Sequence, residues 1–387
     1  MKTHSLQVER VGQIDRANVR FGDLTVLVGP QATGKSIFLE FLKLLVDSGA
    51  ILASLKRYGL DWDKDTRQFL DIYLGEGMRG VWNKHRSRIS FNGKNVDLEG
   101  LVGRQKRNKE ESMFFIPAQR ALTLGQGWPR PFTDYGAGDP FTVRDFSEKL
   151  RLLMESRLGK GESLFPTAQR LRAEIRNLLR TTVFSNFGLK VDRHGAQKRL
   201  VLSSPKKGYQ LPFMVWSAGQ REFAPLLLGL YWLLPSAKTS RRGDLEWVVI
   251  EEPEMGLHPK AISAALLLVL ELLGRGYRVC LSTHSPHVLD MVWALNVFRQ
   301  HKADSRQLLN LFGVKCTPSM VSVAEKALEK DVQVHYFNPT TGRTTDISNL
   351  DPGAAESAES GWGGLVEFSG RVADAVAGVV ASSMEQQ

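Results

Sequence analysis

The chain has 387 residues, of which 42% are apolar and 24% are charged, and a formal net charge of +10. This composition is typical of a globular protein, and the length allows two or three lobes around a large core. The longest mostly apolar runs, 224–234 and 264–273, are too short to cross a bilayer, and no secretory signal opens the sequence. Two cysteines cannot form a disulfide framework, so a cytoplasmic location is expected.

The N-terminal part of the sequence predicts a hairpin, a buried strand and a helix. Apolar and polar residues alternate over 5–20, which is typical of two short strands. The apolar run Leu24–Val28 predicts a buried strand, and 37–46 predicts a helix with leucine and phenylalanine on its inner face.

The eight residues that link this strand to this helix predict a phosphate-binding loop. Two glycines let the backbone curl so that its N–H groups point at phosphate oxygens, and the helix N-terminus adds positive potential. The lysine is expected to reach the β- and γ-phosphates, and the serine hydroxyl to ligate Mg²⁺. The loop therefore predicts binding of a nucleoside triphosphate. Its residues are Gly29, Pro30, Gln31, Ala32, Thr33, Gly34, Lys35 and Ser36.

Residues 47–111 have a weaker pattern, which predicts an insertion between the loop helix and the next core strand. Within it, an Asn-Gly pair in 89–96 is typical of a two-residue hairpin. Basic residues cluster at 84–88 and at 104–109. These clusters suit DNA phosphates, but they suit equally a solvated loop or an acidic protein partner.

A second buried strand is predicted over 113–116, and Gln119 follows it. This glutamine either contacts Mg²⁺, water or phosphate, or lies in a plain loop. Helices are then predicted over 143–157 and 166–179, and two or three short strands within 187–215.

Ser217 and Gln220 form a capping box ahead of a helix over 221–234, which is apolar nearly all round and is therefore expected to be buried. This capping is by itself sufficient to explain why a serine and a glutamine occupy these two positions.

Two later strands end in charged or titratable residues. The apolar run 247–250 precedes Glu251, Glu252 and Glu254, whose close carboxylates are costly to bury unless a divalent cation lies between them. The run 278–282 precedes His284, which faces the ligand crevice at the carboxyl edge of an open α/β sheet or is a surface histidine. A third interpretation is a zinc site formed with Cys280 and His287, for which the sequence offers no second pair of metal ligands.

In this order, the motifs resemble the ABC-type ATPase head of the RecF, SMC and OLD-like branch, often described as AAA-family ATPases of bacterial defence and DNA-maintenance systems. The stretch Ile-Glu-Glu-Pro-Glu-Met-Gly-Leu-His-Pro at 250–259 and Thr-His-Ser-Pro at 283–286 carry the resemblance most closely. It implies an α/β P-loop NTPase fold with a mixed central sheet, an N-terminal β hairpin, a helical lobe and insertions.

The expected organisation is a head over 1–304 and an appended segment over 305–387. The head contains the insertion at about 47–111 and a lobe of helices and strands at about 120–208. The appended segment is predicted as a helix, a hairpin across 338–341, and a helix over 372–382 that packs against the head or a partner.

The resemblance also implies roles for individual residues. Glu251 would hold Mg²⁺ together with Ser36, and Glu252 would polarise the attacking water. His284 would contact the γ-phosphate, and Gln119 would sense metal and water.

The signature segment, residues 217–220, is the part that reaches the ATP of the opposite subunit in this family. Ser217, Gly219 and Gln220 match it, whereas Ala218 stands where glycine is common. A capped helix N-terminus is suited to a γ-phosphate, so two copies are expected to sandwich two ATP molecules.

The resemblance implies a Mg²⁺-dependent ATPase that acts as an ATP-gated switch in a homodimer or larger homo-oligomer, away from membranes. It would be the sensor or motor of an anti-phage defence or toxin-like system with a separate effector protein. The alternatives are a RecF-like, ATP-dependent DNA-binding protein of repair or maintenance, for which the basic residues of the insertion are the discriminating feature, and a non-hydrolysing nucleotide-bound scaffold.

Several motifs of related classes are absent from the sequence. It has no Cys-x-x-Cys hook, no long heptad run, and no Asp-x-Asp pair within 310–387, which disfavours hook-bearing ATPases, SMC proteins and a TOPRIM nuclease domain. It also lacks the Asn-Lys-x-Asp motif that recognises guanine, so ATP is the expected nucleotide.

Overall fold

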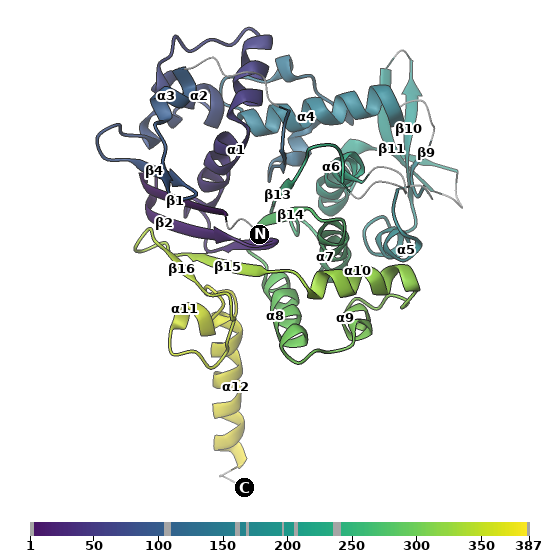
Figure 1. Ribbon diagram of the computed structural model, residues 1–387. Helices are drawn as coiled ribbons and strands as arrows, with labels where there is room; N and C mark the ends of the chain where they lie inside the picture. The colour runs from purple at the N-terminus through teal and green to yellow at the C-terminus, as the bar shows by residue number, and fades with distance from the viewer. Residues whose placement is uncertain are drawn as a thin grey trace.

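The computed structural model describes residues 4–103, 110–158, 163–167, 170–195, 197–204, 208–234 and 241–384. The basic cluster at 104–109 lies outside these residues. Figure 1 shows a central sheet with helices on both sides, a small N-terminal sheet, a lobe beside them and a protruding C-terminal helix.

The central sheet has six strands in the order β16-β15-β3-β14-β13-β6. Neighbouring strands are parallel except for β16, which is antiparallel to β15. The strands are β3 (Leu24–Val28), β6 (Met113–Ile116), β13 (Trp247–Glu251), β14 (Arg278–Thr283), β15 (Val332–Phe337) and β16 (Thr344–Asp346). The predicted buried strands and the mixed sheet are confirmed.

Both faces of this sheet are buried, which explains why its strands are apolar without interruption. Along β13, Val248 and Ile250 belong to one core cluster, whereas Trp247 and Val249 belong to the other. The first cluster lies under the helices that follow β13 and β14, and the second under the N-terminal sheet and the P-loop helix.

The N-terminal sheet has the strand order β2-β1-β4-β5. Its strands are β1 (His4–Val11), β2 (Ile14–Phe21), β4 (Arg88–Phe91) and β5 (Lys94–Asn95), so both predicted hairpins are confirmed. Because β4 pairs with β1, the hairpin from the predicted insertion belongs to the N-terminal sheet. Three short helices flank it: α2 (Thr66–Leu74), η1 (Met78–Val81) and α3 (Leu98–Gly103).

The P-loop helix α1 (Lys35–Arg57) is longer than the predicted 37–46. The helix continues because Ile51, Leu52 and Leu55 are also buried. It bends at Asp47 (φ −118°, ψ 23°), whose carboxylate accepts hydrogen bonds from the backbone N–H groups at the start of β6.

The lobe contains a four-stranded antiparallel sheet in the order β12-β11-β10-β9. Its predicted strands are confirmed, but the helix expected over 166–179 begins later, at Ala173, because the backbone of Arg172 is extended (φ −59°, ψ 150°). The elements are η2 (Arg120–Thr123), β7 (Leu124–Gly125), β8 (Trp128–Pro129), η3 (Phe132–Asp134), α4 (Phe141–Leu153), η4 (Met154–Leu158), β9 (Ser163–Phe165), α5 (Ala173–Thr182), β10 (Gly188–His194), β11 (Gln197–Ser203), β12 (Gln210–Pro212) and η5 (Phe213–Val215).

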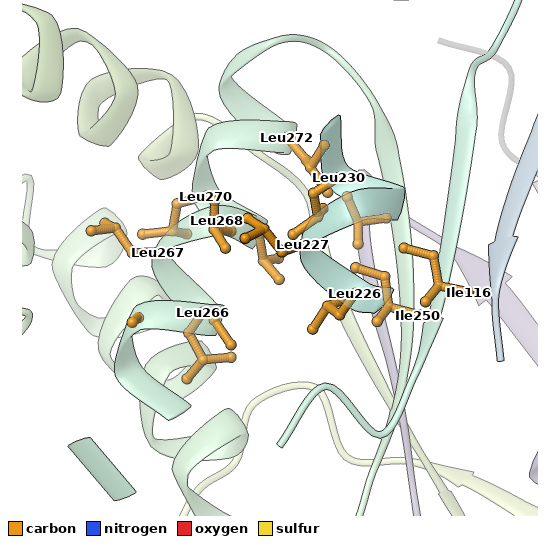
Figure 2. Packing of buried hydrophobic residues seen from close by; sticks show 14 of the residues in the cluster. Ile116, Leu226, Leu227, Leu230, Ile250, Leu266, Leu267, Leu268, Leu270 and Leu272 are labelled. Carbon is orange, nitrogen blue, oxygen red and sulfur yellow. The ribbon is translucent and has the colours of Figure 1, made fainter. Parts of the chain in front are cut away.

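Three apolar helices cover one face of the central sheet: α6 (Ala218–Leu233), α7 (Pro259–Gly274) and α8 (Pro286–Gln300). Figure 2 shows Leu227 and Leu230 of α6 beside leucines of α7, with Ile250 and Ile116 of the sheet next to Leu226. Burial of a leucine side chain contributes about 1.5–3 kcal/mol, so this packing fixes α6 and α7 firmly against the strands that carry the site.

The C-terminal residues contribute two strands to the central sheet. They form α9 (Ser305–Leu311), α10 (Pro318–Leu328), the hairpin β15–β16, α11 (Ser357–Ser360) and α12 (Glu367–Met384). The predicted hairpin is confirmed, but β15 pairs in parallel with the P-loop strand β3, with Val334 opposite Val26. Residues 332–346 are thus part of the head's sheet, although they lie beyond the expected boundary at 305.

Helix α12 extends away from the body of the protein (Figure 1). Residues 367–381 are all exposed, so contact with the head, one of the two expected partners of this helix, is not seen in the described chain. Among the described residues, no helix combines the length and the apolar character needed to cross a membrane.

Candidate nucleotide-binding site

The loop between β3 and α1 has the shape of a phosphate cradle. Gly29 (φ 150°) and Gly34 (φ 93°) adopt backbone conformations that favour glycine, and a Cβ atom on Gly34 would lie 2.6 Å from the Ile14 side chain. The Lys35 ammonium group curls back over the loop and donates hydrogen bonds to the carbonyl oxygens of Gly29 (2.7 Å) and Pro30 (2.8 Å). Helix α1 begins at Lys35, so the free backbone N–H groups of its first turn lie next to this loop.

Burial lowers the pKa of Lys35 to about 8, although the carboxylates of Glu252, Glu251 and Glu254 act to raise it. The carboxylates at the end of β13 therefore favour the protonated form of the P-loop lysine. A phosphate group beside the ammonium would add a further negative charge and favour its protonated form.

Glu251, the last residue of β13, is buried behind the P-loop. Its Oε2 atom accepts a hydrogen bond from the Ala118 backbone N–H (3.2 Å), whereas Oε1 is buried without a hydrogen-bond partner. The pKa of Glu251 is raised by burial, although the Ser36 hydroxyl acts in the opposite direction. A hard cation held by Ser36 and Glu251 would satisfy the unpartnered oxygen, so these two residues fit the predicted Mg²⁺ site.

Glu252 follows in a left-handed backbone conformation (φ 44°), which is costly for a residue with a side chain and directs the carboxylate out of the strand. Its N–H still donates to the Ser282 carbonyl oxygen of β14 (2.9 Å). The Oε1 atom of Glu252 lies 3.3 Å from Nε2 of His284, and this hydrogen bond is the main cause of the lowered pKa of Glu252.

Glu254, in the loop that follows β13, supports His284 in the loop that follows β14. Its Oε1 atom accepts hydrogen bonds from the Thr283 hydroxyl (2.7 Å) and the His284 backbone N–H (2.8 Å). The sequence places Glu254 beside the other two carboxylates but does not predict this positioning role; a third acid at the end of a buried strand was the available signal.

Gln119 is the residue that precedes η2 and follows Ala118. Its side chain is exposed at the beginning of η2, and the neighbouring Ala118 N–H is what contacts Glu251. The predicted role of Gln119 as a sensor of metal and water stays a prediction.

The signature segment packs against the loop that follows Glu254. The predicted capping box is confirmed, since the Gln220 N–H donates to Ser217 Oγ (3.3 Å) and the Ser217 N–H donates to Gln220 Oε1 (3.1 Å). Gly219 lies so close to Gly256 that a Cβ atom on Gly219 would be 2.7 Å from the Gly256 carbonyl oxygen. The capped N-terminus of α6 is exposed at Ser217, and it is joined to the carboxylate loop by backbone contact.

Three adjacent strands bring the chemistry together. In the order β3-β14-β13, they end in the P-loop, His284 and the glutamates, at the carboxyl edge of a parallel sheet. Figure 1 shows β13 and β14 between α1 and α6. A lysine in a glycine-bearing loop, a buried carboxylate beside a serine hydroxyl, and an ionised carboxylate beside a histidine suit a nucleoside triphosphate with its divalent cation. The fold and this arrangement define an ABC-type P-loop NTPase.

Comparison with known families agrees with this class. Residues 24–290, well over half of the chain, match the model of the family described as "AAA domain, putative AbiEii toxin, Type IV TA system". The chain belongs to this family, whose members are P-loop proteins that bind ATP. The matched region runs from the P-loop strand to the beginning of α8.

Among curated proteins, the chain is similar to an OLD nuclease of Thermus scotoductus, with 23% identity over 338 residues. The match covers 77% of this chain and 62% of the relative, so the chain spans about three fifths of that protein's length.

Among solved structures, similarity extends to an SMC head bound to the C-winged helix domain of ScpA (10% identity, TM-score 0.39, 89% of this chain and 97% of that chain). It also extends to the SMC head domain of Thermotoga maritima (12% identity, TM-score 0.30, 75% and 92%).

Proposed function

We propose that the chain is a cytoplasmic, Mg²⁺-dependent ATPase that acts as an ATP-gated dimerising switch. It would serve as the sensor or motor subunit of an anti-phage defence or toxin-like system whose effector is a separate protein. The observation that carries the ATPase activity is the contact between Glu252 and His284, 3.3 Å apart, beside a P-loop lysine that is influenced by three carboxylates.

Each residue has a separate task in this proposal. Lys35 and the P-loop N–H groups bind the β- and γ-phosphates, and Ser36 and Glu251 hold the cation, which supplies charge neutralisation of the phosphates. Glu252, kept ionised by His284, accepts a proton from the attacking water, and His284 orients the γ-phosphate. Glu254 fixes the backbone of His284.

The dimerising part of the proposal rests on the signature segment. Ser217 and Ala218 are exposed at the N-terminus of a 16-residue helix, where they are accessible to the ATP bound by a second copy. The link to defence or toxin systems rests on the family's description and on the similarity to an OLD nuclease.

The test is the variant Glu252→Gln. Loss of a positioned general base is expected to slow steady-state hydrolysis by about 10²–10⁴-fold. Binding of a fluorescent ATP analogue should persist, and size-exclusion chromatography with light scattering should show an ATP-dependent dimer that no longer dissociates. Unchanged hydrolysis would remove Glu252 from the mechanism, and a variant that stays monomeric with Mg²⁺-ATP would refute the switch.

One observation favours the alternative, an ATP-dependent DNA-binding protein. Lys84, His85, Arg86 and Arg88 are exposed together beside β4, in a chain of net charge +10. DNA affinity should then fall steeply with salt and change with ATP. A flat, weak response with and without ATP would leave the effector-linked switch as the better proposal.

A further inference from the structure

Arg120 is a buried arginine within the site to which the family resemblance gives no role. It lies in η2, one residue after Gln119, and its exposed fraction is 0%. A fully buried arginine is rare because its charge is costly to remove from water, unless its donors are satisfied. Burial lowers its pKa, and four surrounding glutamates, with Glu222 first among them, act in the opposite direction.

The guanidinium group of Arg120 hydrogen-bonds to two separate parts of the protein. Nη1 donates to the Glu251 carbonyl oxygen and Nη2 to the Glu252 carbonyl oxygen, both at 2.8 Å. Nε donates to the Glu222 carbonyl oxygen in the first turns of α6 (3.1 Å) and lies 3.8 Å from the Glu222 carboxylate. One rigid, planar group thus joins the backbone of both site glutamates to the helix that begins with the signature segment.

The two carbonyl groups that Arg120 holds are those at which β13 ends and the chain turns. Glu252 has a positive φ of 44°, a conformation that persists only where surrounding contacts enforce it. The bonds from Arg120 to the carbonyls of Glu251 and Glu252 are such contacts. A shift of α6 would pull on Glu222, and through Arg120 it would move the peptide that carries the Glu252 side chain.

We propose that Arg120 is a positioning residue that couples the signature segment to Glu252, so that hydrolysis responds to whether a second copy is docked. The inference rests on the proposed ATP-gated dimer. The N-terminus of α6 would be held by the ATP of the second copy. The planar guanidinium group of Arg120 would then hold the backbone of Glu252, the proposed general base, in the position that α6 sets. A lysine cannot reproduce this geometry, because its three donors radiate from one nitrogen, whereas the guanidinium group spreads its donors over three nitrogens in a fixed plane.

The test uses the full chain with the variants Arg120→Lys and Glu222→Gln. Arg120→Lys keeps the positive charge but loses the fork; Glu222→Gln keeps all backbone contacts and removes only the charge of the 3.8 Å pair, so it is the milder change. The matched control is Arg144→Lys in α4. Arg144 is also buried (4% exposed), and its Nε donates to the backbone carbonyl oxygen of Asp139 (2.7 Å).

We expect Arg120→Lys to lower kcat by about 10²-fold, as for a small misplacement of a catalytic group, while the dissociation constant of a fluorescent ATP analogue changes less than about threefold. Glu222→Gln should lower kcat in the same direction by a smaller factor, and Arg144→Lys should keep the wild-type kcat. In the Glu252→Gln background, Arg120→Lys should weaken ATP-dependent dimerisation by at least about tenfold. A purely structural role would lower thermal stability and ATP affinity together with kcat.

The outcomes separate this inference from the proposed function. If Glu252→Gln alone dimerises with ATP and both coupling variants keep the wild-type kcat and dimerisation, the inference is wrong and the switch stands. If Glu252→Gln alone stays monomeric, the switch and the coupling fail together. Should Arg120→Lys not fold, Arg120→Gln replaces it, because its neutral amide is less costly to bury and still lacks the three-nitrogen plane; a wild-type kcat and dimerisation of that variant overturn the coupling.

Discussion

The imidazole Nε2 atom of His284 lies 3.3 Å from Oε1 of Glu252, so the residue that we propose orients the phosphate also lowers the pKa of the proposed general base. The hydrogen bond from His284 is the largest cause of the lowered pKa of Glu252, ahead of the opposing effect of burial. The two side chains come from the ends of neighbouring strands, β14 and β13, and their contact depends on the parallel pairing of those strands.

This contact predicts a pH effect of His284→Ala. Without the hydrogen bond, the pKa of Glu252 should rise, so the base is protonated over a wider acidic range and the acid limb of the kcat profile moves to higher pH. Steady-state hydrolysis between pH 5 and 9 measures the shift. His287→Ala is the matched control, because His287 is exposed in α8 and contacts Asp290 (3.4 Å). An acid limb at its wild-type position would contradict the contact.

A second prediction concerns proton uptake when ATP binds. Burial lowers the pKa of Lys35 to about 8, and the phosphates should raise it again because they stabilise the ammonium form. At pH 8, about half of the free protein has lost this proton, so binding should take up about 0.5 proton, and this uptake should vanish at pH 6.5.

Titration calorimetry in buffers of different ionisation enthalpy measures this uptake directly. Lys35→Arg is the control, since a guanidinium stays protonated at these pH values and its ATP binding should involve no such uptake. Equal proton uptake by Lys35→Arg and the wild-type chain at pH 8 would assign the proton to another group.

The strands and the residues at their ends could be predicted from the sequence, because an uninterrupted apolar run followed by polar residues is a local pattern. The P-loop, Glu251, Glu252 and His284 were found in this way, and parallel pairing brings them together. The wider arrangement depends on contacts between distant residues. Val334 pairs beside Val26 across more than 300 residues, and no local pattern indicates which strand β15 will join.

Arg120 shows the same limit within the site. The residues after β6 are polar, which draws attention to Gln119, but only the packing of η2 beneath α6 turns Arg120 inward and leaves Gln119 exposed. The sequence signal was an arginine directly after a buried strand. Three of its four backbone acceptors lie more than 100 residues away, so their identity required the fold.

A third prediction concerns Glu40, which is buried in α1 behind the site. Its Oε1 atom accepts a hydrogen bond from the Thr142 hydroxyl, whereas Oε2 is buried without a partner, and burial raises the pKa of Glu40 to about 8. The folded chain therefore keeps this carboxyl protonated between about pH 4.5 and 8, where the unfolded chain ionises it. The contribution of this group to the free energy of unfolding is therefore fully present below about pH 4.5 and is lost progressively as the pH rises from there through 8.

Glu40→Gln should remove this pH dependence, because the amide stays neutral. The free energy of unfolding of the variant relative to the wild-type chain should increase with pH by up to about 1.4 kcal/mol per unit between pH 4.5 and 8, and then level off. Urea unfolding at several pH values measures the difference. A difference that is constant over this range would mean that Glu40 is ionised in the folded chain.

The last prediction concerns the buried ion cluster that fixes α1 to β6. The ammonium group of Lys43 is buried and donates to Asp47 Oδ2 (2.6 Å), to the Glu111 carboxylate and to the Met113 carbonyl oxygen (2.6 Å). Lys149 of α4 shares the Glu111 carboxylate, which joins α4 to the same cluster. The attraction between these opposite charges offsets the cost of removing them from water, so the removal of one group leaves a buried charge without a partner.

Lys43→Met, which keeps most of the side-chain volume, should therefore lower the free energy of unfolding by about 3–5 kcal/mol. Lys84→Met is the control, because Lys84 pairs with Glu99 (2.7 Å) at an exposed position and its loss should leave the unfolding midpoint unchanged. Because Asp47 also receives the N–H groups of Ser112 and Met113, the damage should extend to β6 and weaken ATP binding. Chemical unfolding with and without ATP measures both effects. A midpoint for Lys43→Met equal to that of Lys84→Met would mean that the cluster contributes no net stability, as a buried ion network can when desolvation offsets its attraction.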